Sequence, residues 1–165
     1  MAQTKLGENV VNTIGNLPSV GSNAADFTLT GNDLKEIELK SFAGKNVVLN
    51  IFPSIDTSVC ATSVREFNKR AASLADTVVL CISEDLPFAM KRFCGAEGID
   101  KVVTLTGFRN PAFGKNYGVE LVDGGFKGLF ARAIVVIGKD GKVKHTELVP
   151  QIGQEPNYDA ALSAL

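Results

Sequence analysis

Short hydrophobic runs, separated by amphipathic stretches and turn residues, recur along the chain. Residues 47–52 form an almost wholly apolar run of strand length, which is typical of a strand buried on both faces. From Ser58 to Leu74, apolar side chains return at near-helical spacing with charged side chains opposite them, and this pattern predicts an amphipathic helix. Asp56 or Thr57 is the expected N-cap of that helix.

The same alternation of strand and helix continues through the rest of the chain. Apolar runs predict strands at residues 77–82, 102–105 and 133–137. Helices are expected from Pro87 to about Cys94, over residues 110–117 and over residues 156–165. Gly95 or Gly98 is expected to end the helix that begins at Pro87.

The two ends of the chain carry signals for antiparallel strands. The Asp140-Gly141 pair predicts a tight turn, which makes residues 142–148 the hairpin partner of the strand before it. Within the first 45 residues, the segments 27–29 and 37–39 alternate as half-buried strands do. Strands that alternate with helices and end in a hairpin and a helix predict an α/β domain with a mixed central sheet flanked by helices.

This order of elements favours a thioredoxin-like fold with an N-terminal β-hairpin extension, although other α/β folds share the pattern. A chain of 165 residues fits one domain with its own core, and no repeat or Pro/Gly/Ser-rich linker divides it. We therefore expect a single domain over residues 1–165.

Composition and charge exclude several classes of function. Hydrophobic residues make up 45% and charged residues 21%, an ordinary globular balance. Seventeen basic and 18 acidic residues leave a net charge of −1, so no overall field attracts nucleic acid or an anionic membrane. No apolar run approaches the ~20 residues that span a bilayer, and the first residues lack the apolar core of a signal peptide. The expected location is the cytoplasm.

Three cysteines, Cys60, Cys81 and Cys94, are the most reactive side chains in the chain. An odd number without a C-x-x-C pair argues against the disulfide framework of a secreted protein. In a reducing compartment, each is either an apolar core residue or a reactive thiol, and its surroundings decide which.

Cys60 occupies the position where reactive chemistry is expected. The loop before it leaves the carboxyl end of a central strand, the edge at which α/β sheets bind ligands. Cys60 also lies in the first turn of the predicted helix, where free N–H groups and the helix dipole stabilise a thiolate. Thr57 can direct its hydroxyl to the same place, and Pro53 presents an apolar surface that excludes water. The alternative is a core cysteine, since Val59 and Val64 are close in sequence.

The other two cysteines differ in their surroundings. Cys94 lies among small, polar and charged residues at the end of a predicted helix, which suits an accessible thiol but also a helix end without a role. If both thiols act, Cys60 and Cys94 are the two halves of a cycle from sulfenic acid to disulfide. Cys81 lies inside a strand and is expected to be a packing residue.

Other types of active site lack residues that they require. His145 is the only histidine, and it alternates with charged residues as a solvated strand residue does, so a cysteine hydrolase is not supported. The cysteines are not in the short-spaced pairs that bind zinc. The glycine-rich segment 123–128 matches neither a dinucleotide-binding motif nor a P-loop, and it is expected to be a loop. Two alternatives remain. One is a thiol–disulfide carrier, although the C-x-x-C motif of such proteins is missing here, and the other is a binding module without catalysis.

The pattern Pro53-x-x-x-Thr57-x-x-Cys60 resembles the active-site signature of the peroxiredoxins. The longer segments 52–60, 92–98 and 127–133 resemble those of the bacterial thiol peroxidases, which are atypical two-cysteine peroxiredoxins. Three matching segments in the right order are far more specific than one. The resemblance implies a thiol-dependent peroxidase that reduces hydrogen peroxide and alkyl hydroperoxides in antioxidant defence.

The resemblance also implies a role for each site residue. Cys60 is the expected peroxidatic cysteine, and Arg132 the cation that stabilises its thiolate and polarises the peroxide. Thr57 is expected to hydrogen-bond the thiolate and the peroxide, and Pro53 to shield the site. Cys94 is the expected resolving cysteine, which forms an intramolecular disulfide with Cys60. Thioredoxin is the implied reductant and a homodimer the implied assembly, with no cofactor and no metal.

Apolar residues next to Cys60 suggest how the substrate is bound. Ile55 and Val59, together with Phe52, flank the expected site. An apolar collar of this kind favours alkyl hydroperoxides over hydrogen peroxide, and we therefore expect Ile55 and Val59 to contact the substrate.

Overall fold

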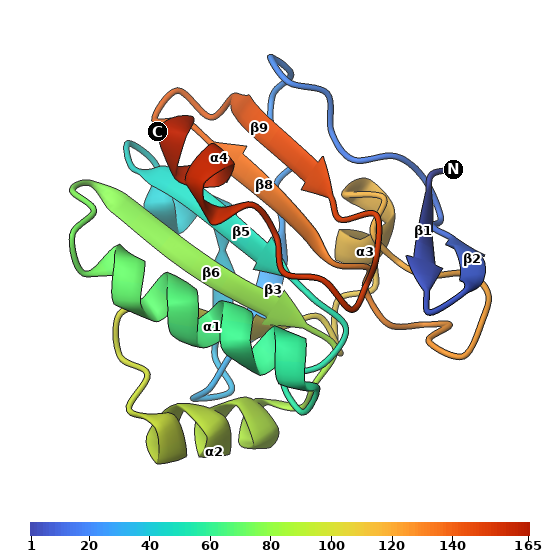
Figure 1. The fold of residues 1–165 in the computed structure, drawn as a ribbon. Coiled ribbons are helices and arrows are strands. Elements are labelled where there is room, and N and C mark those ends of the chain that lie inside the picture. The colour runs from blue at the N-terminus through green and yellow to red at the C-terminus, as the bar shows by residue number, and fades with distance from the viewer.

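A seven-stranded mixed sheet forms the centre of the protein in this computed structural model, which describes all 165 residues (Figure 1). Its strands lie in the order β4 (Glu36–Glu38), β3 (Thr28–Gly31), β7 (Val103–Thr106), β6 (Thr77–Ser83), β5 (Asn46–Ile51), β8 (Ala133–Ile137) and β9 (Val143–Leu148). Strands β5, β6 and β7 are parallel, whereas β8 joins β5 in antiparallel pairing and β9 joins β8 in the same way.

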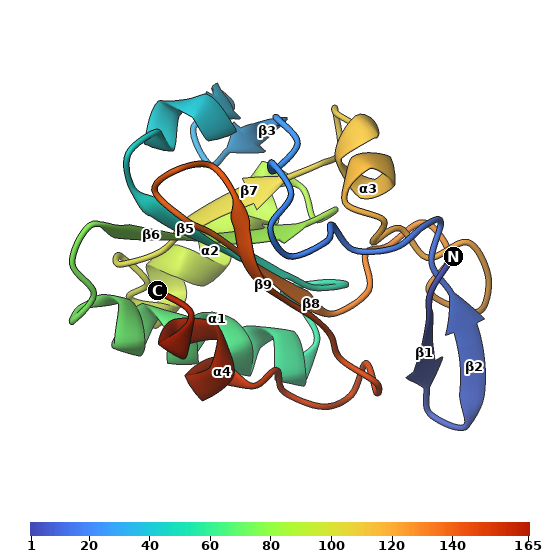
Figure 2. The same cartoon turned by 90° about the horizontal axis from the view of Figure 1, so that it is seen from above.

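Helices cover both faces of the sheet. The remaining elements are α1 (Ser58–Ala71), α2 (Pro87–Glu97), α3 (Ala112–Asn116), α4 (Tyr158–Ser163), the 3₁₀ helix η1 (Leu39–Phe42) and the separate hairpin of β1 (Gln3–Leu6) and β2 (Asn9–Asn12). Figure 2 shows α1 and α4 on one side of the sheet and α3 on the other, with the β1–β2 hairpin projecting from the end of the molecule. None of these helices is long and apolar enough to cross a membrane.

Alternation of side chains along the central strands builds two separate cores. On β5, Val47, Leu49 and Ile51 belong to the core beneath α3, which also holds Phe113. Val48 lies on the opposite face, in a core that includes Cys60, Cys81 and residues of α1, α2 and α4. Both faces are buried, as the apolar run at residues 47–52 predicts.

The structure confirms the predicted fold class and adjusts several boundaries. The sheet is mixed and helices flank it, and the N-terminal hairpin is present. The first long helix ends at Ala71 rather than at Leu74. Helix α2 continues through Glu97 and ends at Gly98, whose φ of 66° suits glycine, so Cys94 lies inside the last turns of the helix. Leu39 begins η1 instead of extending the expected strand 37–39.

His145 departs from its predicted solvated position. It lies on β9, is half-buried, and its Nε2 atom is buried without a hydrogen-bond partner. The reason is its register, because His145 lies opposite Val136, whose side chain packs in the core covered by α4. The expected loop at residues 123–128 contains no helix or strand.

Candidate active site

The candidate site lies at the edge of the sheet where β5 ends and α1 begins. Antiparallel pairing places Ala133 opposite Ile51, so the start of β8 lies at the same edge as the end of β5. Arg132 lies immediately before β8 and two residues before Ile134, whose side chain packs on the α1 face. Because side chains two residues apart along a strand point to the same face, Arg132 also projects toward α1. The topology brings Arg132 to Cys60, although 72 positions separate them in the sequence.

Cys60 is fully buried in the first turn of α1. The first backbone hydrogen bond at this end runs from Ala61 N–H to the Thr57 carbonyl, so the N–H groups before Ala61 have no acceptor within the helix. The free N–H groups and the dipole of the 14-residue helix favour negative charge at this end. A thiolate at Cys60 therefore lies in a suitable electrostatic environment.

Arg132 provides the positive charge at the sulfur. Its Nη2 atom donates to Cys60 Sγ at 3.2 Å, and its Nε atom donates to the Ile152 carbonyl at 2.8 Å. The residue is only 1% exposed, and its Nη1 atom is buried without a partner. A buried cation is costly unless it is paired, so an anionic sulfur stabilises this arrangement. The free Nη1 donor can bind a further acceptor.

Thr57 and Pro53 shape the loop that precedes Cys60. Thr57 is the N-cap residue of α1, as predicted, but its side chain makes no capping hydrogen bond. Its hydroxyl donates to the Ser54 carbonyl at 3.0 Å, and its N–H donates to the same carbonyl at 3.1 Å. The Thr57 hydroxyl thus closes a turn and does not donate to the Cys60 sulfur in this state. Pro53 is buried at the start of the loop.

Apolar residues around Cys60 are less open than a substrate collar requires. Phe52 and Ile55 are buried in the same core cluster as Cys60, with Ile55 only 1% exposed. Val59 is half-buried. Among these three residues, Val59 is the one that solvent reaches in this conformation.

Cys94 faces different neighbours from Cys60. Its sulfur lies 3.6 Å from Thr104 Oγ1 and 3.9 Å from Asn32 Nδ2, on a small pocket beside β7. All three cysteines are free thiols in this structure, and Cys94 is half-buried. The structure therefore does not bring Cys60 and Cys94 together in its reduced form.

Cys81 lies on the α1 face of β6 and is completely buried. Asn50, opposite Cys81 in the register, donates its amide to the Cys81 sulfur at 3.7 Å. Burial raises the pKa of the Cys81 thiol to about 12, with the Asn50 hydrogen bond opposing the shift. At neutral pH this thiol is neutral and unreactive.

Two groups at this edge were not identified from the sequence. The Ile152 carbonyl orients Arg132, but a main-chain group of a loop leaves no trace in composition or spacing. Asp85 follows the carboxyl end of β6 and binds the loop before Cys60. An acidic residue at the end of a strand next to β5 is the signal that marks it.

No group of three His, Cys, Asp or Glu side chains is arranged to hold a metal ion.

Comparison with known proteins identifies the family of the chain. The Redoxin family model matches residues 19–162. The chain is 62% identical to the thiol peroxidase of Mycobacterium tuberculosis (strain ATCC 25618 / H37Rv) over all 165 residues, which cover 99% of that protein. It is 53% identical to the thiol peroxidase of Corynebacterium glutamicum, again over its full length and 99% of that protein.

Solved structures support the same fold. A peroxiredoxin-like protein from Aquifex aeolicus superposes with a TM-score of 0.93 at 37% identity, covering 99% of this chain and 95% of that one. The thiol peroxidase from Chromobacterium violaceum superposes with a TM-score of 0.90 at 21% identity, covering 98% and 93% of the two chains, and bears on the fold alone.

The chain therefore belongs to the Redoxin family, the class that its fold and its cysteine site define. Its full-length relatives place it among the thiol peroxidases, which are peroxiredoxin enzymes.

The neutral state of Cys81 leads to a prediction about thiol labelling. We expect iodoacetamide to leave Cys81 unmodified in the native protein at pH 8 and to modify it once urea unfolds the chain. With a pKa of about 12, only about one thiol in ten thousand is ionised at that pH, and the sulfur is also buried. Peptide mass spectrometry measures the modification. Rapid labelling of native Cys81 contradicts this assignment.

Proposed function

We propose that Cys60 is the peroxidatic cysteine and that Arg132 activates it for attack on a peroxide. The observation that carries the proposal is the 3.2 Å contact between Arg132 Nη2 and Cys60 Sγ at a buried helix N-terminus. The guanidinium favours the thiolate, which is the nucleophilic form of cysteine. The same group has a free donor, Nη1, for a peroxide oxygen.

Charge movement defines the first chemical step. The Cys60 thiolate attacks one oxygen of ROOH, the S–O bond forms as the O–O bond breaks, and RO⁻ leaves and takes up a proton to give ROH. Negative charge thus passes from the sulfur to the departing oxygen. Arg132 and the free N–H groups of α1 are fixed donors around that charge, and donors of this kind lower the barrier without reorganisation. We assign Thr57 and Pro53 to shaping and shielding this site.

Cys94 is the proposed resolving cysteine. The Cys60 sulfenic acid condenses with the Cys94 thiol, which forms an S–S bond and releases water. A disulfide needs Cα atoms about 4.4–6.8 Å apart, and the two sulfurs have separate neighbours in the reduced state. We therefore propose that the first turn of α1 and the last turns of α2 rearrange in each cycle.

The contacts of α2 suit such a rearrangement. Its fully buried residues, Pro87 and Met90, both belong to its first half. The half that carries Cys94 has no fully buried side chain. Phe93 is half-buried against the core beneath α1, Cys94 contacts Thr104 and Asn32, and Glu97 pairs with Arg65 of α1 at 2.9 and 3.0 Å. Exposed ion pairs contribute little, so this half of α2 is the part that can unwind more easily.

The reductant and the assembly complete the proposal. A dithiol protein, thioredoxin by family resemblance, reduces the Cys60–Cys94 disulfide and is itself oxidised to a disulfide. We place this cycle in the reducing cytoplasm. A homodimer is the assembly that the family resemblance implies, and the exposed apolar side chains Leu86, Phe88 and Phe108 are available for its interface.

The charge of Arg132 leads to a prediction about peroxide turnover. We expect Arg132→Met to lower kcat/KM for hydrogen peroxide by about 100-fold or more, because a fixed donor to the reacting atoms is lost. Arg132→Lys should recover part of this rate, since it keeps the charge but not the geometry that binds both Cys60 and Ile152. Steady-state kinetics measures the effect, and circular dichroism confirms folding. Full activity of folded Arg132→Met would refute the proposal.

Substitution of each cysteine separates the two chemical steps. We expect Cys60→Ser to be inactive with any peroxide, and Cys94→Ser to consume one equivalent of peroxide without turning over with thioredoxin. Cys81→Ala should cycle almost normally. Peroxide consumption with thioredoxin and its reductase is the measurement. An inactive but folded Cys81→Ala would mean that the resolving thiol is wrongly assigned.

Val59 and Ile55 form the proposed apolar contact with the substrate, of which Val59 is the solvent-accessible part. We expect a lower KM for cumene hydroperoxide than for hydrogen peroxide, and a smaller difference in Val59→Thr, which keeps the shape but adds a hydroxyl. Thr62→Val, at an exposed position one turn further along α1, serves as the control and should change neither value. Equal KM values for both peroxides in the wild type would remove the support for this contact.

A further inference from the structure

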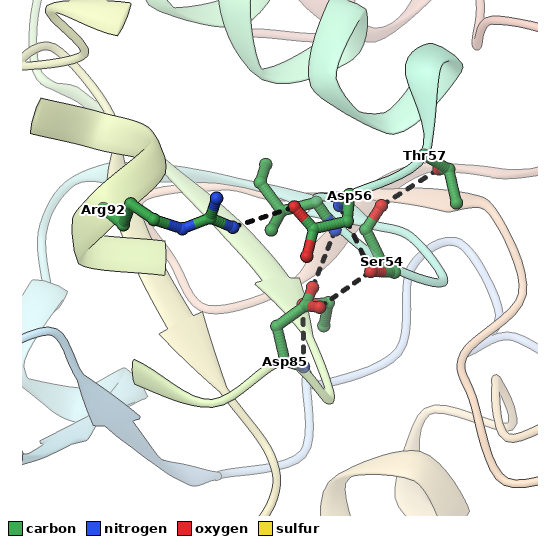
Figure 3. A network of polar contacts seen from close by, with 7 residues as sticks. Ser54, Asp56, Thr57, Asp85 and Arg92 are labelled. Atoms are coloured by element: carbon green, nitrogen blue, oxygen red, sulfur yellow. Dashed lines mark hydrogen bonds and ion pairs between the residues drawn. The ribbon is translucent and has the colours of Figure 1, made fainter. Parts of the chain in front are cut away.

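Asp85 binds the loop that leads from β5 to Cys60. Its carboxylate accepts hydrogen bonds from Ser54 Oγ and from the Ile55 N–H, both at 2.7 Å, and from the Ser83 hydroxyl. Figure 3 shows Asp85 directed toward the turn that contains Ser54, Asp56 and Thr57. Two of these donors fix consecutive residues of the loop, and the third, Ser83, ties the carboxylate to the end of β6. Hydrogen bonds to an ionised acceptor are the strong ones.

Ser54 passes this constraint on to the start of α1. Its hydroxyl oxygen accepts from the Asp56 N–H at 3.2 Å, and its carbonyl accepts from both the N–H and the hydroxyl of Thr57. Thr57 is the N-cap residue of α1, and Cys60 follows in the first turn. The carboxylate of Asp85 is therefore connected to the helix end that carries the sulfur through Ser54 and Thr57.

Asp85 is also held at the end of β6, just before α2 begins. Its N–H donates to Ser83 Oγ at 3.2 Å, and Leu86, the next residue, is the N-cap of α2. The loop has one other polar link to α2, the ion pair between Asp56 and Arg92 at 3.0 Å, which is exposed on both sides. Exposed pairs contribute little, so the contacts of Asp85 are the main polar link between the Cys60 loop and the segment that joins β6 to α2.

Electrostatics alone gives no reason for a carboxylate here. A negative charge near Cys60 opposes formation of the thiolate. Burial raises the pKa of the neighbouring Glu84 to about 7, and the charges of Glu120 and Asp85 add to this shift, so a second carboxylate beside Glu84 is itself unfavourable. The contribution of Asp85 must therefore come from the geometry that it imposes on the loop.

We propose that Asp85 is a positioning residue, which holds the turn of residues 54–57 so that Cys60 Sγ meets Arg132. The inference rests on the proposed roles of Cys60 and Cys94. It assigns opposite effects to Asp85 in the two chemical steps. The carboxylate favours attack on the peroxide, and its hydrogen bonds must loosen before the start of α1 rearranges to reach Cys94.

The test compares Asp85→Ala with Asp85→Asn. Alanine removes all three acceptor contacts, whereas the asparagine oxygen still accepts from the Ile55 N–H and its amide donates to a reoriented Ser54 hydroxyl. We expect sulfenic acid formation with hydrogen peroxide, followed by rapid quench and mass spectrometry in a Cys94→Ser background, to slow about 10- to 100-fold in Asp85→Ala. Asp85→Asn should recover most of that rate.

The second step provides a readout that general destabilisation would not give. With Cys94 present, we expect the first-order conversion of the Cys60 sulfenic acid to the disulfide, separated from the slower first step by fitting the rapid-quench time course, to be as fast in Asp85→Ala as in the wild type, or faster. Asp56→Asn removes a charge from the same loop without touching the Asp85 contacts, and it should leave both rates unchanged. If Asp85→Ala does not fold, Ser54→Ala, which removes one of the three contacts, should show a smaller loss in the first step.

Each other outcome overturns the inference. Equal losses in Asp85→Ala and Asp85→Asn would mean that charge, not geometry, is responsible. Equal slowing of both chemical steps would indicate general destabilisation, and a wild-type rate in Asp85→Ala would mean that the contacts do not position Cys60. An active Cys60→Ser variant would instead refute the proposed function, whatever Asp85 does.

Discussion

The contact between a buried guanidinium and the Cys60 sulfur is the interaction on which the rest of the site depends. Arg132 is almost fully buried, and its charge is compensated by the Ile152 carbonyl and by the sulfur. A thiolate at Cys60, as proposed, and the buried charge of Arg132 would therefore stabilise each other. The N-terminus of α1 adds N–H groups without a helical acceptor, which favour an anion at the same end of the helix.

This requirement explains the architecture around the site. The β5–β8 pairing must be antiparallel to bring the residue before β8 to the edge where β5 ends. The alternation of side chains must then direct Arg132 toward the α1 face, where Val48 and Ile134 form the core. A shift of one residue in this register would direct the guanidinium into the opposite core. The apolar packing of the central strands thus also sets the electrostatics of the cysteine.

The two helices at this edge differ in how they are held. Helix α1 packs Val64 and Phe67 fully into the core, whereas the half of α2 that carries Cys94 has no fully buried side chain. A rigid element that presents one thiol and a weakly held element that presents the other suit a reaction in two steps. Attack on a peroxide needs fixed geometry, and disulfide formation needs movement.

The sequence by itself determined most of the elements and the position of Cys60 at the start of a helix. Hydrogen-bond periodicity and side-chain alternation act over a few residues, so local pattern is enough to predict such elements. It predicts the strand before Pro53, the helix that begins at Ser58 and the buried strand around Cys81. For the same reason Cys60 was recognisable at a helix start, and the peroxiredoxin-like signature strengthened that interpretation.

The tertiary structure alone decided which distant groups meet. From local pattern, Arg132 is only the charged start of a strand, and its partner depends on the strand order and register of the whole sheet. The Ile152 carbonyl, the Asp85 contacts and the separation of Cys94 from Cys60 depend on the same long-range pairing. The hydroxyl of Thr57 also turned to the Ser54 carbonyl rather than to the sulfur. Hydrogen bonds between residues far apart in sequence have no period along the chain, and only the folded structure fixes their partners.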